Sequence, residues 1–168
     1  MLDAAFGAVG RLAERPSADF DFFMGIWRCR HRFLVRRLVH CRDWIEFDGC
    51  CAARRILGGW GNSDESEINF PGDPYRAMTL RTWDPMRRKW TLYQLDSRRP
   101  GKLGAPVRGG FDKGLGVFLG DDRHEGRPIR VRCLWSRITE NSARWEQAFS
   151  ADNGCSWETN WYMDIARV

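Results

Sequence analysis

Residues 25–33 read GIWRCRHRF, and they carry the clearest structural signal in the chain. Aromatic, thiol and imidazole side chains alternate here with arginines: Trp27, Cys29, His31 and Phe33 share one parity, and Arg28, Arg30 and Arg32 share the other. Successive side chains of a β-strand point to opposite faces of the sheet. The stretch therefore predicts a strand with one largely apolar face and one charged face.

Similar alternation recurs along the rest of the chain. It predicts further strands, most of them short, at 44–51, 65–70, 76–83, 90–96, 115–119, 128–136, 143–150 and 156–166. Turn-forming residues separate the strands, with Asp84 to Lys89, Gly126 and Asn153-Gly154 as the clearest hairpin turns.

Two other segments read differently. Residues 2–14 place apolar side chains at helical spacing before Pro16, which predicts one short N-terminal helix. Residues 98–110 contain Pro and Gly repeatedly, which predicts the longest loop and a mobile lid. We expect one domain over 1–168, with 1–18 as helix and lead-in and 19–168 as the barrel.

No crossover helix separates the predicted strands, and parallel strands need such crossovers. The sheet is therefore expected to be antiparallel. A sheet of this many strands must curl, and closure removes its exposed edges. The predicted fold class is all-β: a closed antiparallel β-barrel of about eight to ten strands with a short N-terminal helix.

Composition bounds the function. Nine tryptophans among 168 residues indicate a large core, a lined cavity, or both. The net charge is +5, but the arginines are scattered among carboxylates, so we expect neither nucleic-acid nor membrane partners. Arginine also suits anionic ligands. A small-molecule ligand is the expected partner, and a homodimer is left open.

The six cysteines show no C-x-x-C spacing and no zinc-finger pattern. We interpret them as reduced, mostly buried thiols, which favours a cytoplasmic location. The N-terminus does not resemble a signal peptide, and no apolar run approaches the length of a membrane span. No metal site is expected.

Several motifs carry a resemblance: DFDFxxGxWR (19–28), LGGxGN (57–62), MTLRxxDP (78–85), GDD (120–122) and SARWEQAFSxDxGxxWETNWxMD (142–164). Together they resemble a bacterial protein family of unknown function with a calycin-like barrel. The G-x-W at 25–27 is similar to that of lipocalins. The resemblance implies that Trp27 plugs the closed end of the barrel and that Arg167 packs over it.

Ser150-x-Asp152-x-Gly154-x-x-Trp157 also resembles the Asp-box of sialidase-type propellers, which is a rigid peripheral hairpin. The residues suit that role. Asp152 can accept hydrogen bonds from turn amides, Gly154 can take a positive φ, and Trp157 can pack inward. A single copy argues against a propeller, which needs repeats.

Strand parity selects the side chains that face the barrel interior. As ligand-binding candidates it gives Phe33, Trp90, Gln94, Arg98, Trp145, Gln147, Thr159, Trp161 and Met163. The last hairpin leaves its own parity open, since an even loop places Gln147 with Glu158, and an odd loop places it with Thr159. We favour the odd loop, with Gln147 and Thr159 inside and Glu146 and Glu158 outside.

Three functions fit a barrel whose interior is lined by these side chains. The first is an intracellular binding barrel for an apolar or aromatic molecule with a polar or anionic group. The second is a cofactor-free isomerase or cyclase in which His31 or Asp96 acts as the acid/base. The third is a haem-binding barrel with His31 as the iron ligand. For the first two no cofactor is expected.

Overall fold

The computed structural model describes residues 16–168, so the helix expected at 2–14 lies outside the described residues. Ten strands form one closed antiparallel barrel, which confirms the predicted fold class. The strands are β1 (Gly25–Leu34), β2 (Trp44–Ile56), β3 (Gly61–Ile68), β4 (Tyr75–Asp84), β5 (Lys89–Asp96), β6 (Val107–Asp112), β7 (Leu115–His124), β8 (Arg127–Ser136), β9 (Ser142–Ser150) and β10 (Glu158–Arg167). Two short 3-10 turns, η1 (Asp21–Phe23) and η2 (Leu57–Gly59), complete the described part.

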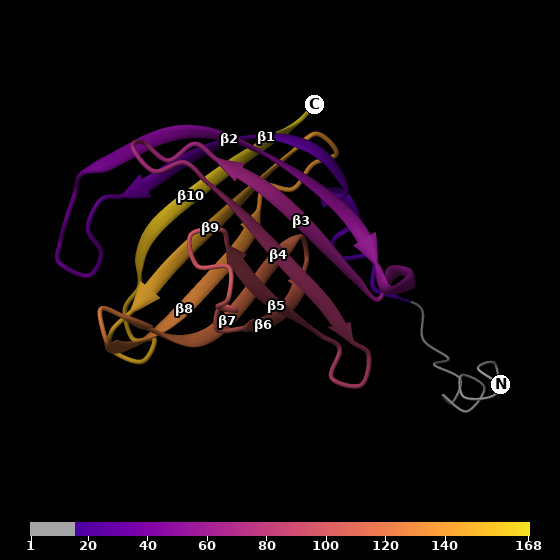
Figure 1. The fold of residues 1–168 in the computed structure, drawn as a ribbon. Helices are drawn as coiled ribbons and strands as arrows, with labels where there is room; N and C mark the ends of the chain where they lie inside the picture. The colour runs from indigo at the N-terminus through magenta and orange to yellow at the C-terminus, as the bar shows by residue number, and fades with distance from the viewer. Residues whose placement is uncertain (1–15) are drawn as a thin grey trace.

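Each strand pairs with the next along the chain, and β1 pairs with β10 to close the barrel (Figure 1). The closing register runs from Trp27 opposite Arg167 to Phe33 opposite Trp161. The narrowest seam lies between β5 and β6, where only three residue pairs are formed. Within residues 16–168, no helix is long and apolar enough to cross a membrane.

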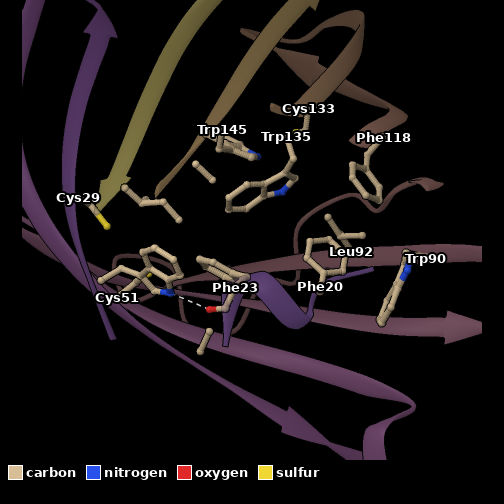
Figure 2. Close-up of a cluster of buried hydrophobic side chains, with 14 of the residues drawn as sticks. Phe20, Phe23, Cys29, Cys51, Trp90, Leu92, Phe118, Cys133, Trp135 and Trp145 are labelled. Atoms are coloured by element: carbon tan, nitrogen blue, oxygen red, sulfur yellow. Dashed lines mark hydrogen bonds between the residues drawn. The ribbon is translucent and has the colours of Figure 1, made fainter. Parts of the chain in front are cut away.

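One end of the barrel is filled by aromatic side chains. The η1 segment crosses the interior there and carries Phe20 and Phe23 into a cluster with Trp90, Phe118 and Trp135 (Figure 2). Phe20 meets Trp90 edge-on at 5.0 Å, and Phe23 lies 4.9 Å from Trp135 between ring centroids. All five side chains are at most 2% exposed. This end is therefore a packed core.

Trp27 and Arg167 hold the η1 segment in place at this closed end. The Trp27 indole is fully buried and donates to the carbonyl of Phe23 at 2.7 Å. The Arg167 guanidinium carbon lies 4.1 Å from the Trp27 ring centroid. Its nitrogens donate to the carbonyls of Phe22 and Met24, both at 2.7 Å. Arg167 thus occupies the position over Trp27 that the resemblance implies.

Several boundaries differ from the predicted ones, and both β2 and β7 run further, to Ile56 and His124, than the predicted ends at residues 51 and 119. The segment 98–110 is only partly loop, because β6 begins at Val107. Two consecutive glycines hid this strand, and the first has a steric reason: a Cβ on Gly109 would lie 1.8 Å from the carbonyl oxygen of Val117 on β7. Only glycine lets the two strands approach so closely. Likewise β3 begins at Gly61, before the strand predicted at 65–70.

Candidate functional site

The two halves of the barrel differ in how far their inward side chains are buried. At the closed end these side chains form the packed core. In the opposite half, Phe47, Ile68 and Phe149 are buried, but a group of inward positions remains partly exposed to solvent, namely Phe33, Tyr75, Ala77, Gln147, Trp161 and Met163. A side chain that points into a barrel and still meets solvent borders unfilled interior. This open half is the candidate site.

His31 lies between the packed core and the open half. Its side chain is buried and its Nδ1 accepts the indole N–H of Trp161 at 3.1 Å. The imidazole also stacks on Phe47, with 4.9 Å between ring centroids. Burial lowers the pKa of His31 to about 4, and the charge of Asp48 opposes that shift only weakly. The imidazole is therefore neutral at physiological pH.

The surroundings of His31 do not fit a haem ligand. An axial histidine has to point one ring nitrogen at the iron. Nδ1 is bonded to Trp161, and Nε2 lies 3.0 Å from the position that a Cβ on Gly49 would take. Both nitrogens thus face neighbouring strands.

The last hairpin brings together four of the nine predicted ligand-binding side chains. Trp161 pairs with Gln147, and Met163 pairs with Trp145, all four on the inward parity. Trp145 and Trp161 meet edge-on at 5.7 Å. With Phe33 opposite Trp161 on β1, they form one continuous wall. The preferred placement of Gln147 inside therefore agrees with the observed register.

A bulge at Asn160 corrects the rest of that register. Asn160 has no partner residue on β9, is fully buried, and accepts a hydrogen bond from the Gln147 amide at 2.9 Å. This extra residue exchanges the inward and outward positions of the β10 residues that precede it. Thr159 lies opposite Ala148 on the outward parity, and Glu158 lies opposite Phe149 on the inward parity. The expectation that Thr159 faces inside and Glu158 outside was wrong.

The Asp-box hairpin has the expected polar contacts. Asp152 accepts the amide N–H of Ser156 at 2.9 Å, and Gly154 has φ +93°. Hydrogen bonds from Ser156 hold the pKa of Asp152 down to about 2. Trp157 differs from expectation, because its ring lies under the guanidinium of Arg132, whose position on β8 is outward. The hairpin is rigid but its tryptophan covers the outside of the barrel.

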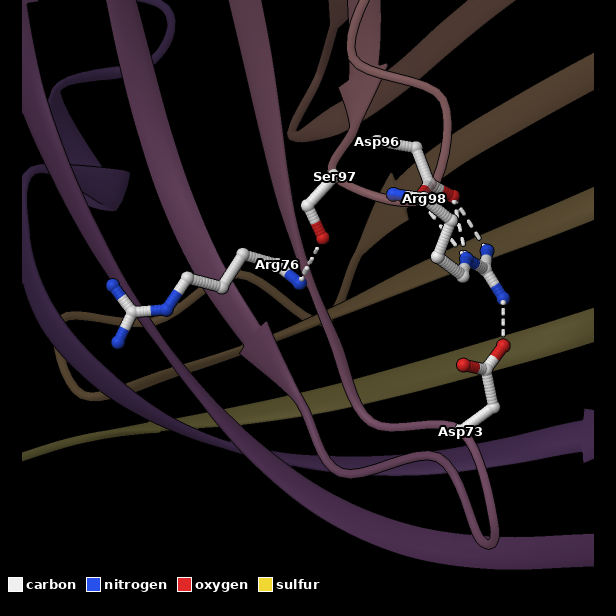
Figure 3. A network of polar contacts seen from close by, with 5 residues as sticks. All are labelled: Asp73, Arg76, Asp96, Ser97 and Arg98. Carbon is white, nitrogen blue, oxygen red and sulfur yellow. Dashed lines mark hydrogen bonds and ion pairs between the residues drawn. The ribbon is translucent and has the colours of Figure 1, made fainter.

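Arg98 and Asp96 neutralise each other at the end of β5 (Figure 3). The Nε of Arg98 lies 3.0 and 3.2 Å from the two carboxylate oxygens of Asp96, and Nη1 reaches Asp73 at 3.3 Å. The guanidinium also stacks 3.5 Å from the Tyr75 ring centroid. The hydrogen bonds from Arg98 lower the pKa of Asp96. Asp96 is thereby a weaker base than an ordinary aspartate.

The two further candidates on β5 lie in different surroundings, since Trp90 is in the packed core and Gln94 lies on the inward parity toward the open end, opposite Thr79. Trp90 belongs to the packed core, where its indole N–H donates to Asp19 at 3.0 Å. Its close packing against Phe20 leaves no face for a ligand. Gln94 is exposed, and its carbonyl accepts the amide of Gly104 from the following loop at 2.8 Å.

Sequence reasoning missed Arg37, which lies in the connection between β1 and β2. Its guanidinium carbon lies 4.2 Å from the Phe33 ring centroid and 5.3 Å from that of Phe149. Burial lowers the pKa of Arg37 to about 10, so it stays charged at neutral pH. The sequence does contain a sign of it: in LVRRLV, residues 34–39, two arginines are flanked by apolar residues on both sides. Such an apolar run is unusual in a connection between strands.

The same connection forms one wall of a cleft at the open end. The amide of Leu38 donates to the Glu158 carboxylate at 2.7 Å and ties the connection to β10. The cleft has a volume of about 220 Å³, room for more than a single water molecule. It is lined by Phe33, Val35, Arg36, Arg37, Val39, His124 and Glu125.

Comparison with known proteins adds no assignment. No protein-family model matches the chain, and the search of curated proteins finds no match. The function has to be argued from the site itself.

Proposed function

We propose that this chain is a small-molecule-binding barrel whose ligand occupies the open half. The observation that carries the proposal is the contrast in burial between inward side chains at the two ends. Core positions such as Trp27 and Phe118 are fully buried, whereas Phe33, Trp161 and Met163 remain partly exposed on the same parity. Protein interiors are normally close-packed, so accessible inward aromatics favour a binding cavity.

The chemistry of the wall indicates the ligand class. Phe33, Trp161 and Met163 offer apolar and aromatic surface, and Gln147 adds one polar side chain. Binding sites for small organic molecules combine such surfaces with a few placed polar groups. The proposed ligand is apolar or aromatic with a polar or anionic group.

The alternative of a cofactor-free isomerase or cyclase has less support. His31 is a weak base because burial lowers its pKa, and its Nδ1 already accepts a hydrogen bond. Asp96 is paired with Arg98. A general base needs a free lone pair and a pKa near the working pH. Neither candidate offers both.

The resemblance to the bacterial calycin-like family of unknown function is retained as a proposal. It is supported by the closed ten-strand barrel and by Arg167 packed over Trp27. A reducing, cytoplasmic location is proposed on the six cysteines, which are all unpaired.

Phenylnaphthylamine, a neutral aromatic probe whose fluorescence rises in apolar surroundings, tests the binding proposal. We expect saturable binding to the wild-type protein. Ala77 lies on the inward parity of β4, opposite Ser66, and Met78 lies on the outward parity. Ala77→Phe is expected to fill the interior and to weaken binding by about tenfold or more, equivalent to 1.4 kcal/mol.

Met78→Phe is the matched control, because it adds an aromatic ring to the neighbouring position on the outer face. It is expected to leave the affinity unchanged. The proposal fails if the wild-type protein binds no probe and native mass spectrometry of the purified protein shows no retained small molecule. Equal loss in both variants would also count against it.

A further inference from the structure

Arg37 forms no ion pair with a carboxylate in the described residues 16–168, and unlike the exposed Arg36 and Arg42 of the same connection it is half-buried. Its Nε is buried without a hydrogen-bond partner. The charge of Glu158 acts on Arg37, but its carboxylate accepts the amide N–H of Leu38 and forms no ion pair with Arg37. The cation is held mainly by the faces of Phe33 and Phe149.

Two other arginines at the barrel ends have carboxylate partners, although the Nε of Arg81 is also buried without a hydrogen bond. Arg81, in the closed half, contacts Asp64 at 2.5 Å and donates to Asn62 at 3.1 Å. Arg98 pairs with Asp96. A buried charge without a partner is costly, so the contrast marks Arg37 as a group prepared for an external anion.

The cleft gives that anion a place. Arg37 and Phe33 line it together, so a ring lying on Phe33 would carry an attached acidic group next to the guanidinium. Arg36 and His124 line the same cleft and add no negative charge to it. Glu125 is the acidic residue in its lining. Glu125 is exposed at the β7–β8 turn, where solvent screens its charge.

We propose that Arg37 is the anion-binding residue of this site and that the ligand is an aromatic acid, with a carboxylate or sulfonate on the guanidinium and its ring against Phe33. This inference rests on the proposed binding function. A planar guanidinium can donate two parallel hydrogen bonds to such an anion. The aromatic neighbours hold the cation in place before the ligand arrives.

A matched pair of probes tests the inference. Anilinonaphthalenesulfonate and phenylnaphthylamine share one ring system and differ by the sulfonate. We expect the wild-type protein to bind the sulfonate at least about tenfold more tightly. In Arg37→Gln and Arg37→Met this preference is expected to disappear, so that the two probes bind with similar affinity. Arg37→Met keeps an unbranched chain over Phe33.

Arg42→Gln is the control for net charge, since Arg42 lies exposed in the same connection and does not line the cleft. It is expected to keep the preference. Binding of the amine with no preference for the sulfonate, or a preference that survives both Arg37 variants, overturns the inference and leaves the binding barrel standing. Binding of neither probe overturns the proposed function as well. Near-UV circular dichroism identical to that of the wild type confirms that the variants are folded.

Discussion

At the scale of single residues, the state of His31 is set by its surroundings. Burial lowers its pKa to about 4, from an ordinary value of 6.5. In the unfolded chain the pKa returns to the ordinary value, so protons bind preferentially to the unfolded state between these two values. The stability that depends on the neutral imidazole is complete above about pH 6.5 and is lost as the pH falls toward 4.

We therefore expect the free energy of unfolding of the wild-type protein, relative to that of His31→Gln, to fall by roughly 3 kcal/mol between about pH 7 and about pH 4, since one pKa unit corresponds to 1.36 kcal/mol. Urea unfolding of both proteins at the two pH values measures it. His40 and His124 are present in both proteins and cancel. A difference that is the same at both pH values would contradict a buried neutral His31.

Residue patterns predicted the wall of the site better than its polar groups. Alternation placed Phe33, Trp161 and Gln147 together because parity is a property of the strand. Arg37 escaped, since it lies in a connection where no parity applies. Thr159 was misplaced because one bulged residue, Asn160, reverses the parity on its N-terminal side.

At the scale of elements, the seam between β5 and β6 is the weakest part of the barrel wall. Three residue pairs join these strands, from Trp90 opposite Gly109 to Leu92 opposite Val107. Nine pairs join β7 to β8. Beyond Leu92, a single backbone hydrogen bond from Gly104 to Gln94 continues the seam toward the open end.

Amide hydrogen exchange is expected to be faster in residues 93–97 and 103–107 than in β7 and β8. Backbone amides that lack a ladder partner open with little free energy. Exchange followed by mass spectrometry on peptides from each segment measures the difference within one sample. Equal protection of the two regions would show that the seam is closed in solution by contacts other than the ladder.

Element prediction succeeded wherever apolar and polar side chains alternate and failed where glycines interrupt the pattern. The strand β6 was read as loop because Gly109 and Gly110 have low strand propensity. Its place is fixed by the close approach to β7, a tertiary constraint that local sequence does not express. The order of the strands followed from antiparallel neighbours joined by short turns.

At the scale of the whole molecule, the barrel has one main core, and each strand pairs with two neighbours. Loss of any strand opens the circle and exposes the aromatic cluster. We expect tryptophan fluorescence and far-ultraviolet circular dichroism to report a single, coincident unfolding transition in urea. Trp27, Trp90 and Trp135 supply the buried fluorophores. If the fluorescence changes at a lower urea concentration than the far-ultraviolet circular dichroism does, one end of the barrel unfolds separately.

The pairing of β1 with β10 has a consequence for how the protein folds during translation. During synthesis β1 leaves the ribosome before the other nine strands, and β10, which completes its ladder, leaves after them. Phe20 and Phe23, which precede β1, have to wait through the translation of the whole barrel before Trp135 and Trp145 can enclose them. The aromatic segment that contains Phe20 and Phe23 therefore stays exposed for longest in the nascent chain. Its exposure to aggregation ends only when β10 is synthesised and pairs with β1.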